Sequence, residues 1–230
     1  MCGRYTLAKN KEEIEELVGD IVGEIPIPLR YNIAPSQPVL TVLNTNPPKL
    51  TLTQWGLVPR WAKDPTLGSR MINARAETAA QKPAFRAPFR NQRCLILADG
   101  FYEWRKQPGR KTKQPWHIRL RSGKAFAFAG LWDKWDAADG TELTSSTILT
   151  TASNDLVSPI HPRMPVILPR AAHSCWLREN DLDALKGLLV PFPSEEMQAF
   201  PVTTRVNNAR HDHPDCVEPA PPPRQTEIDF

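Results

Sequence analysis

Short runs of strand-forming residues dominate the chain and limit the folds it can adopt. Eight of them are rich in β-branched or aromatic residues and are bounded by Pro, Gly, Asn or Asp, as strands are. Many short strands with few helices predict an α+β fold, a single domain built on a mainly antiparallel, curled or barrel-like sheet. The 24 prolines predict long loops. The runs are PVLTVL (38–43), KLTLTQWGL (49–57), CLILADGFYEW (94–104), WHIRLR (116–121), KAFAFAGLW (124–132), STILTTAS (146–153), MPVILP (164–169) and AFPVTTRV (199–206).

One helix is marked by its own capping residues. Asn10 as N-cap, with Glu13 in the reciprocal position, predicts a helix from about Lys11 with Ile14 and Val18 on its apolar face. A second helix is expected after Asn180, where leucines recur at helical spacing (Leu182, Leu185 and Leu189).

The end of the chain changes character. The sequence EPAPPPRQTEIDF contains a proline run, which favours an extended, unfolded segment. We therefore expect a folded domain over residues 1–218 and a flexible C-terminal tail over 219–230.

Charge is distributed unevenly along the chain. The net charge is only +4, from 29 basic and 25 acidic side chains, so bulk charge does not indicate a nucleic-acid binder. Basic residues are concentrated from Arg60 to Arg93 and from Glu103 to Lys124, whereas acidic residues gather near the two ends. The middle of the chain can therefore present a basic face.

Cysteine usage and hydropathy indicate the compartment. The four cysteines lack a CxxC pair and the density of a disulfide framework, which favours a reduced, cytoplasmic protein. No apolar run reaches membrane-spanning length, and the N-terminus lacks the apolar core of a signal peptide. In a reduced cytoplasm we expect the thiol of Cys2 to be free and accessible.

Cys2 directly follows the initiator methionine. If Met1 is removed, Cys2 carries a free α-amine beside its thiol, with ordinary pKa values of about 8 and 8.5. This pair could act as an N-terminal nucleophile on an amide, or it could condense with an aldehyde to an imine that the thiolate closes to a thiazolidine. The alternative is an ordinary buried cysteine.

Glu103 and His161 are candidate proton-transfer groups. His161 lies between prolines in SPIHPRMP, and its ordinary pKa near 6.5 suits acid–base chemistry. Glu103 lies between Tyr102 and Trp104, where partial desolvation would raise its pKa. An edge-strand carboxylate that faces water is an equally good interpretation of Glu103.

Asn73, Arg75 and Glu77 alternate in MINARAE. On a strand they would share one face, and on a helix they would diverge; a polar loop is the simplest alternative. In HDHPDC, His211, His213 and Cys216 have ligand-like spacing, but a fourth ligand is not evident, and we expect no metal site.

The seven tryptophans have two possible uses. Several lie beside basic residues and could stack on unpaired bases, while Arg and Lys hold phosphates. Most tryptophans are nevertheless core residues, and Trp132 and Trp176 are expected to be so.

Eight motifs in order resemble one family. MCGRY, YNIAPSQ, WGLVPRW, INARAET, RCLILADGFYEW, FAGLW, HPRMPVIL and VN followed by CVEP are similar in order and spacing to the SOS response-associated peptidase (SRAP) family. The resemblance runs from Cys2 to about Pro219. It implies a largely antiparallel α+β domain that protects abasic sites in single-stranded DNA by forming a covalent DNA–protein crosslink.

The resemblance also implies roles for individual residues. Cys2 matches the crosslinking residue, exposed when the protein removes Met1 by its own peptidase activity. Asn73 matches the asparagine that holds the reacting sugar, Glu103 a glutamate in methionine removal and proton transfer, and His161 the histidine beside the opened sugar. Sulfur capture of the imine would prevent elimination of the 3′ phosphate, and no cofactor is implied.

Four further residues match DNA-contacting positions of the family. Arg4, Arg75 and Arg163 match phosphate-binding arginines, and Trp104 matches an aromatic residue that blocks base stacking beside the lesion. The implied partner is single-stranded DNA with an abasic site, bound by a monomeric, cytoplasmic and nucleoid-associated bacterial protein.

The last residues depart from the family pattern. Gln225, Ile228 and Phe230 form Q-x-x-I-x-F, which resembles peptides that dock on the bacterial sliding clamp; an ordinary acidic tail is the alternative. Two other function classes also stay open, a thiol peptidase acting on other proteins and a non-covalent single-stranded DNA-binding protein.

Overall fold

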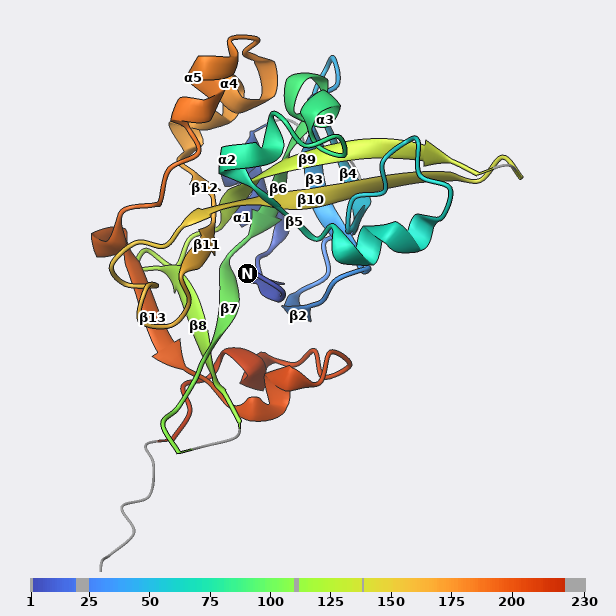
Figure 1. Ribbon diagram of the computed structural model, residues 1–230. Coiled ribbons are helices and arrows are strands. Elements are labelled where there is room, and N and C mark those ends of the chain that lie inside the picture. The colour runs from blue at the N-terminus through green and yellow to red at the C-terminus, as the bar shows by residue number, and fades with distance from the viewer. Residues whose placement is uncertain (1, 20–24, 110–111, 138, 222–230) are drawn as a thin grey trace, which may run out of the picture.

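The computed structural model describes residues 2–19, 25–109, 112–137 and 139–221 (Figure 1). Strands within these ranges form two sheets, one in the order β13-β8-β7-β1-β2 and one in the order β11-β10-β4-β3-β6-β9-β12, with β5 paired to β10. The strands are β1 (Tyr5–Leu7), β2 (Arg30–Ile33), β3 (Pro38–Leu43), β4 (Lys49–Trp55), β5 (Asn73–Arg75), β6 (Arg93–Ala98), β7 (Gly100–Arg105), β8 (Gln114–Leu120), β9 (Phe126–Asp136), β10 (Glu142–Ala152), β11 (Arg163–Pro165), β12 (Ile167–Leu168) and β13 (Met197–Pro201). The α-helices are α1 (Lys11–Val18), α2 (Ala76–Ala79), α3 (Arg86–Asn91), α4 (His173–Arg178) and α5 (Leu182–Gly187).

The second sheet closes into a barrel. β9 pairs with β6 on one side and with β10 on the other, so β10, β4, β3, β6 and β9 form a ring that is antiparallel except between β10 and β4. All six residues of β6 are buried, because the barrel interior covers one face and α4 packs against the strand. The expected α+β fold with a barrel-like, mainly antiparallel sheet is confirmed.

The strand that follows Cys2 is anchored in the core. Tyr5 of β1 packs edge-on against Trp55, with ring centroids 5.1 Å apart, and against Phe128 at 5.7 Å. All three side chains are buried. This packing fixes the N-terminal segment against the barrel, near the centre of the molecule in Figure 1.

The predicted strand 94–104 is in fact two strands in different sheets. β6 belongs to the barrel and β7 to the five-stranded sheet, and the chain changes sheet at Asp99. Gly100 permits the corner, since a Cβ there would lie 2.2 Å from Nε2 of His117. The prediction of strand for this run is confirmed, but the break between β6 and β7 depends on the side chain of His117.

The predicted capped helix is present as α1. Asn10 accepts the backbone N–H of Glu13 and the Glu13 carboxylate accepts the N–H of Asn10, which is the expected capping box. The second predicted helix is α5, which is capped by Asp181 and ends at Gly187, before Leu189. α2, α3 and α4, of four to six residues, were not predicted, because they lack the leucines at helical spacing that mark α5. None of the helices among the described residues is long and apolar enough to span a membrane.

The C-terminal part of the fold crosses back to the N-terminal strands. Two 3₁₀ helices, η4 (Thr204–Asn207) and η5 (Pro214–Val217), follow β13 and lie against β8 and β2, respectively, at the lower end of the molecule in Figure 1. Pro219 still pairs with Val202, and the Ala220 N–H donates to the Pro201 carbonyl. The motif Gln225, Ile228 and Phe230 lies outside the described residues.

Candidate functional site

Cys2 lies three residues before the start of β1, with its side chain fully buried. The expectation of an accessible thiol is therefore wrong for this structure, because the chain that folds around β1 covers the N-terminal segment. The thiol lies 3.8 Å from the Arg4 carbonyl. Burial raises the pKa of the Cys2 thiol, and the nearby negative charge of Glu103 raises it further, so the thiol is protonated at neutral pH.

Asn73 contacts the backbone of Cys2. Its Nδ2 donates a 2.7 Å hydrogen bond to the Cys2 carbonyl, while its Oδ1 is buried and has no hydrogen-bond partner among the described residues. β5 holds Asn73 in place by pairing in parallel with β10, where Asn73 is opposite Ile148. Asn73 and Arg75 lie on β5, whereas Glu77 already lies in α2, so the strand and the helix interpretation each hold for part of the segment. The interpretation as a polar loop is wrong, because β5 pairs with β10.

Glu103 and His161 form a close pair. Nδ1 of His161 lies 3.9 Å from Oε1 of Glu103. Glu103, on β7, is only 3% exposed, so the interpretation of a carboxylate that faces water is wrong. Burial raises the pKa of Glu103, and the charge of His161 counteracts this in part. His161 lies in the loop before β11, where its Nδ1 is 3.1 Å from the Arg163 backbone nitrogen and 3.0 Å from the Arg163 carbonyl oxygen. It accepts from the N–H when Nδ1 is unprotonated and donates to the carbonyl when His161 is positively charged.

Arg163 is engaged by an acidic neighbour. Its Nη1 and Nη2 donate to the two carboxylate oxygens of Glu77 at 2.8 and 2.9 Å, a bidentate ion pair, and Nη2 also donates to the Thr150 carbonyl. The Arg163 side chain is 17% exposed, whereas Glu77 is 53% exposed. Arg75, two residues before Glu77, is exposed. The Arg163 guanidinium, with both Nη groups directed at the same ligand, has the geometry that binds a carboxylate or a phosphate.

Arg4 is held between the N-terminal and C-terminal parts of the chain. Its Nη1 donates to Oδ1 of Asn32 and to the Val206 carbonyl, both at 2.8 Å. Burial lowers the pKa of Arg4, although not enough to deprotonate a guanidinium near neutrality. Arg4 is therefore a cation whose position is fixed before any ligand binds.

Trp104, at the end of β7, is half-buried. Its Nε1 donates to Oδ1 of Asn207 at 2.7 Å, and its ring lies 6.5 Å from that of Tyr102. Trp176 is fully buried, as expected for a core residue, and Trp132 is partly buried.

Three residues that contact these side chains lie within the motifs YNIAPSQ, INARAET and VN, but their contacts were not predicted from the sequence. They are Asn32, Glu77 as the partner of Arg163, and Asn207. The Nδ2 of Asn32, a buried residue, donates to the carbonyls of Val206, Asn208 and His211. Each contact joins segments far apart in the chain, and no local pattern marks such a partner.

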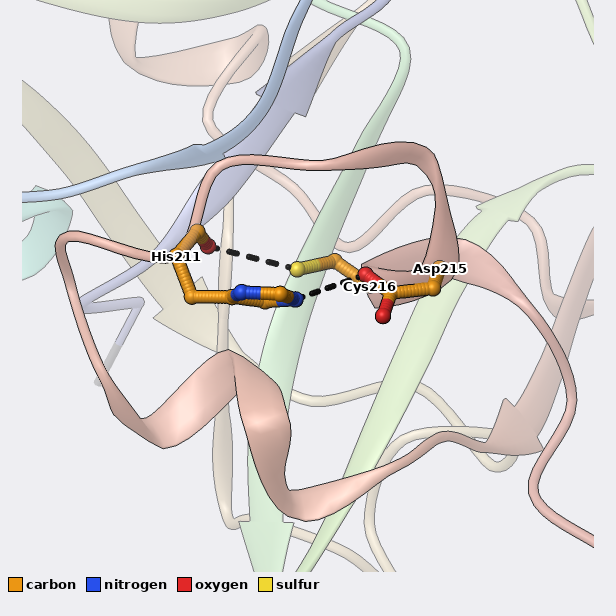
Figure 2. A group of neighbouring side chains, drawn as sticks. All are labelled: His211, Asp215 and Cys216. Carbon is orange, nitrogen blue, oxygen red and sulfur yellow. Dashed lines mark hydrogen bonds and ion pairs between the residues drawn. The ribbon is translucent and has the colours of Figure 1, made fainter.

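The HDHPDC segment folds into a small cluster of possible ligands. The side chains of His211, Asp215 and Cys216 point toward one another in Figure 2, and their ligand atoms lie within 4.8 Å of one another. They already bind partners: Nε2 of His211 pairs with Asp215 at 2.7 Å, the Cys216 thiol donates to the His211 carbonyl at 3.4 Å, and Arg205 pairs with Asp215 at 2.5 Å. A cation would have to displace Arg205, so these contacts favour a structural role in closing the segment.

A protein-family model described as "SOS response associated peptidase (SRAP)" matches residues 1–209. This range includes every candidate residue described above up to Asn207.

Curated relatives carry related names. "Abasic site processing protein YoqW" of Bacillus subtilis is 44% identical over 223 residues, covering 95% of this chain and 99% of that protein. "Abasic site processing protein HMCES" of Rattus norvegicus is 34% identical over 196 residues, covering 73% of this chain and 56% of that protein.

Solved structures share the fold. A protein from Bacteroides thetaiotaomicron is similar with a TM-score of 0.85 at 25% identity, over 95% of this chain and all of that one. A protein from Bordetella bronchiseptica is similar with a TM-score of 0.75 at 27% identity, over 88% of this chain and all of that one.

Proposed function

Because the chain belongs to the SOS response associated peptidase (SRAP) family, we propose that it processes abasic sites in single-stranded DNA by forming a covalent crosslink through Cys2. The names of the relatives, abasic site processing proteins, supply the substrate class. The alternatives, a peptidase acting on other proteins and a non-covalent DNA-binding protein, make different predictions in the experiment below.

The observation that carries the proposal is the convergence of four side chains. Asn73 binds the Cys2 backbone at 2.7 Å, and Glu103, whose charge acts on the Cys2 thiol, lies 3.9 Å from His161. A nucleophile, a neutral hydrogen-bonding group and two proton-transfer groups therefore meet at one place from four separate parts of the chain.

The chemistry begins with the removal of Met1. Water adds across the Met1–Cys2 amide, which frees methionine and leaves Cys2 with a new α-amine. The buried carboxyl of Glu103, with its raised pKa, is suited to deliver and accept the protons of this hydrolysis. The step has to precede crosslinking, since a peptide nitrogen cannot form an imine.

The crosslink then forms in two steps. The Cys2 amine attacks the aldehyde of the opened deoxyribose, and loss of one water gives an imine. The Cys2 sulfur adds to the imine carbon while its proton passes to the nitrogen, closing a thiazolidine without oxidation or reduction. Because the folded state keeps the thiol protonated, ring closure needs a base nearby, and Glu103 and His161 are the groups in place.

Ring closure also protects the DNA strand. An imine that persisted would acidify the adjacent carbon and favour elimination of the 3′ phosphate, whereas the ring has no such activated position. Asn73 would orient the sugar through Oδ1, which has no hydrogen-bond partner among the described residues and can accept from a hydroxyl. Arg4, Arg75 and Arg163 would hold phosphates, and Trp104 would end base stacking beside the lesion.

The test is an intact mass of the protein incubated with a single-stranded oligonucleotide carrying one abasic site and then denatured. We expect an adduct that lacks the mass of Met1 and has lost one water, and none with Cys2→Ala. Cys2→Ser is the matched control, because it keeps the amine but lacks the sulfur, and it should give strand cleavage instead of a stable adduct. Reversible binding alone, released by high salt, would indicate the DNA-binding alternative.

We also propose a protein partner, the replication sliding clamp, and a location near the bacterial nucleoid. Gln225, Ile228 and Phe230 would recruit the protein to the sliding clamp of the replication fork, and the protein would act as a monomer near the bacterial nucleoid. A labelled peptide of residues 224–230 should bind the cognate clamp saturably in fluorescence anisotropy. A linear, non-saturating signal would remove the clamp from the proposal.

A further inference from the structure

Among the described residues, one side-chain hydrogen bond from the C-terminal segment holds the Trp104 indole. Its only hydrogen-bond donor, Nε1–H, binds Oδ1 of Asn207 at 2.7 Å. Its ring otherwise packs against a small apolar cluster that includes Tyr102, Val206 and Cys216. Apolar packing alone does not fix the rotation of an indole about its Cβ–Cγ bond, whereas a hydrogen bond at one edge selects one orientation.

The acceptor is fixed by buried anchors on both sides. The Val206 carbonyl accepts from Nη1 of Arg4 at 2.8 Å and from Nδ2 of Asn32 at 3.2 Å. The Asn208 carbonyl accepts from the same Asn32 amide at 3.0 Å. The backbone before and after Asn207 is therefore tied to one buried side chain, which fixes the point from which Asn207 presents Oδ1 to Trp104, although Asn207 itself is exposed.

One segment, η4, contacts both Arg4 and Trp104. Val206 binds Arg4 and its neighbour Asn207 binds Trp104, and both belong to η4. On the proposed function, Arg4 contacts phosphate and Trp104 contacts the base next to the lesion. η4 thus connects the residue that positions the backbone with the residue that interrupts the stack.

We infer that Asn207 is a positioning residue, which holds the Trp104 indole in the orientation that meets the base beside the abasic site. This inference rests on the proposed function and extends it to a residue that does not touch the reacting atoms. Loss of one such hydrogen bond should slow crosslinking by about three- to fivefold. Folding should be little affected, because Asn207 is exposed.

The first experiment is a double-mutant cycle on the rate of adduct formation with an abasic oligonucleotide. Asn207→Ala removes the acceptor, and Trp104→Phe removes the donor but keeps an aromatic ring. We expect each single variant to react more slowly than the wild type. We expect Asn207→Ala to cause no further loss in the Trp104→Phe background, because the contact is already absent there.

The second experiment needs no DNA. In protein labelled with 5-fluorotryptophan, fluorine NMR should resolve the seven tryptophans, and Trp104→Phe identifies the Trp104 resonance by its loss. Asn207→Ala should move or broaden that resonance and leave the others in place. Asn207→Asp keeps an acceptor oxygen and should restore the original position, which a general loss of structure would not.

The outcomes separate this inference from the proposed function. A wild type that forms no adduct would overturn the proposed function and with it the positioning role in the reaction, whereas the NMR result would still report whether Asn207 orients the indole. With an active wild type, an unchanged rate for Asn207→Ala would overturn the inference alone. So would an equal further loss of rate in the Trp104→Phe background, since Asn207 would then act by another route.

Discussion

The Asn73 side-chain amide donates a 2.7 Å hydrogen bond to the backbone carbonyl of Cys2, across 71 residues of the chain. The contact positions the first residue of the proposed mature protein by a group that carries no charge. On the proposed function, Glu103 and His161 would exchange protons beside Cys2, while Asn73, which orients it, keeps one protonation state.

We expect Asn73→Asp to impair crosslinking more than Asn73→Ala. The aspartate would place a negative oxygen against the Cys2 carbonyl, whereas alanine only removes the donor, which costs about 1 kcal/mol, or roughly a fivefold loss in rate. Single-turnover rates of adduct formation measure both variants. Asn180→Asp, at an exposed position, is the control for added charge; equal rates for Asn73→Ala and the wild type would contradict the role of the contact.

Glu103→Gln should stabilise the protein while abolishing its chemistry. A carboxyl whose folded-state pKa is raised contributes stability in its protonated form, and that contribution is lost as the pH rises through the folded pKa. At pH 7, above the ordinary pKa of a glutamate, the raised pKa is therefore a free-energy cost of folding that glutamine does not have. We expect a Tm higher by about 2–4 °C at pH 7, corresponding to roughly 1 kcal/mol, and a smaller difference near pH 4.

Calorimetry or thermal scanning at the two pH values tests this expectation. A lower Tm for Glu103→Gln at pH 7 would mean that the charged carboxylate is compensated by its neighbours. An unchanged crosslinking rate would remove Glu103 from the proton-transfer steps.

Glu77→Gln should increase the non-covalent affinity for single-stranded DNA. Glu77 occupies both Nη groups of Arg163, so a phosphate has to displace a carboxylate from the same guanidinium. We expect affinity for an oligonucleotide without a lesion to rise by about two- to fivefold at low salt, since a partly exposed ion pair is worth at most about 1 kcal/mol.

The matched control for this variant is the Arg163→Gln background. There, Glu77→Gln should change affinity only by the general effect of removing one negative charge near DNA. If both backgrounds respond equally in fluorescence anisotropy, Glu77 acts through its charge at a distance and does not compete for Arg163.

Asn32→Ala should destabilise the fold. Nδ2 of this buried side chain donates to the carbonyls of Val206, Asn208 and His211, and Oδ1 accepts from Arg4. Removing it takes away these four hydrogen bonds at a buried position, which together cost about 2–4 kcal/mol, and we expect a Tm lower by roughly 5–10 °C. Thermal scanning measures the effect with Asn180→Ala as control, and a Tm within about 1 °C of the wild type would contradict the structural role of Asn32.

The capping box of α1 and the strand-forming runs could be predicted because their signals are local. Asn10 and Glu13 are three residues apart, and the runs in β3, β4, β9 and β10 keep the composition of strands wherever they pair. β1, β2 and β5, of three or four residues, were missed because such lengths carry too little pattern. The C-terminal helix was found from its leucines, but its last turn was placed too far along.

The sequence by itself determined the class of fold, the family and the set of side chains able to do chemistry, since each of these depends on residue type and order. The tertiary structure alone decided that Cys2 is buried, that Glu103 faces His161, and that Arg163 is paired with Glu77. It also divided residues 94–104 between two sheets. The chain passes from one sheet to the other beside Gly100, where the Cβ of any other residue would collide with His117. Such contacts join residues 17 to 202 positions apart through packing and hydrogen bonding, for example Gly100 with His117 and Arg4 with Val206. Neither periodicity nor composition predicts which distant residue a side chain will contact, because these contacts form only when the sheets pack around the core.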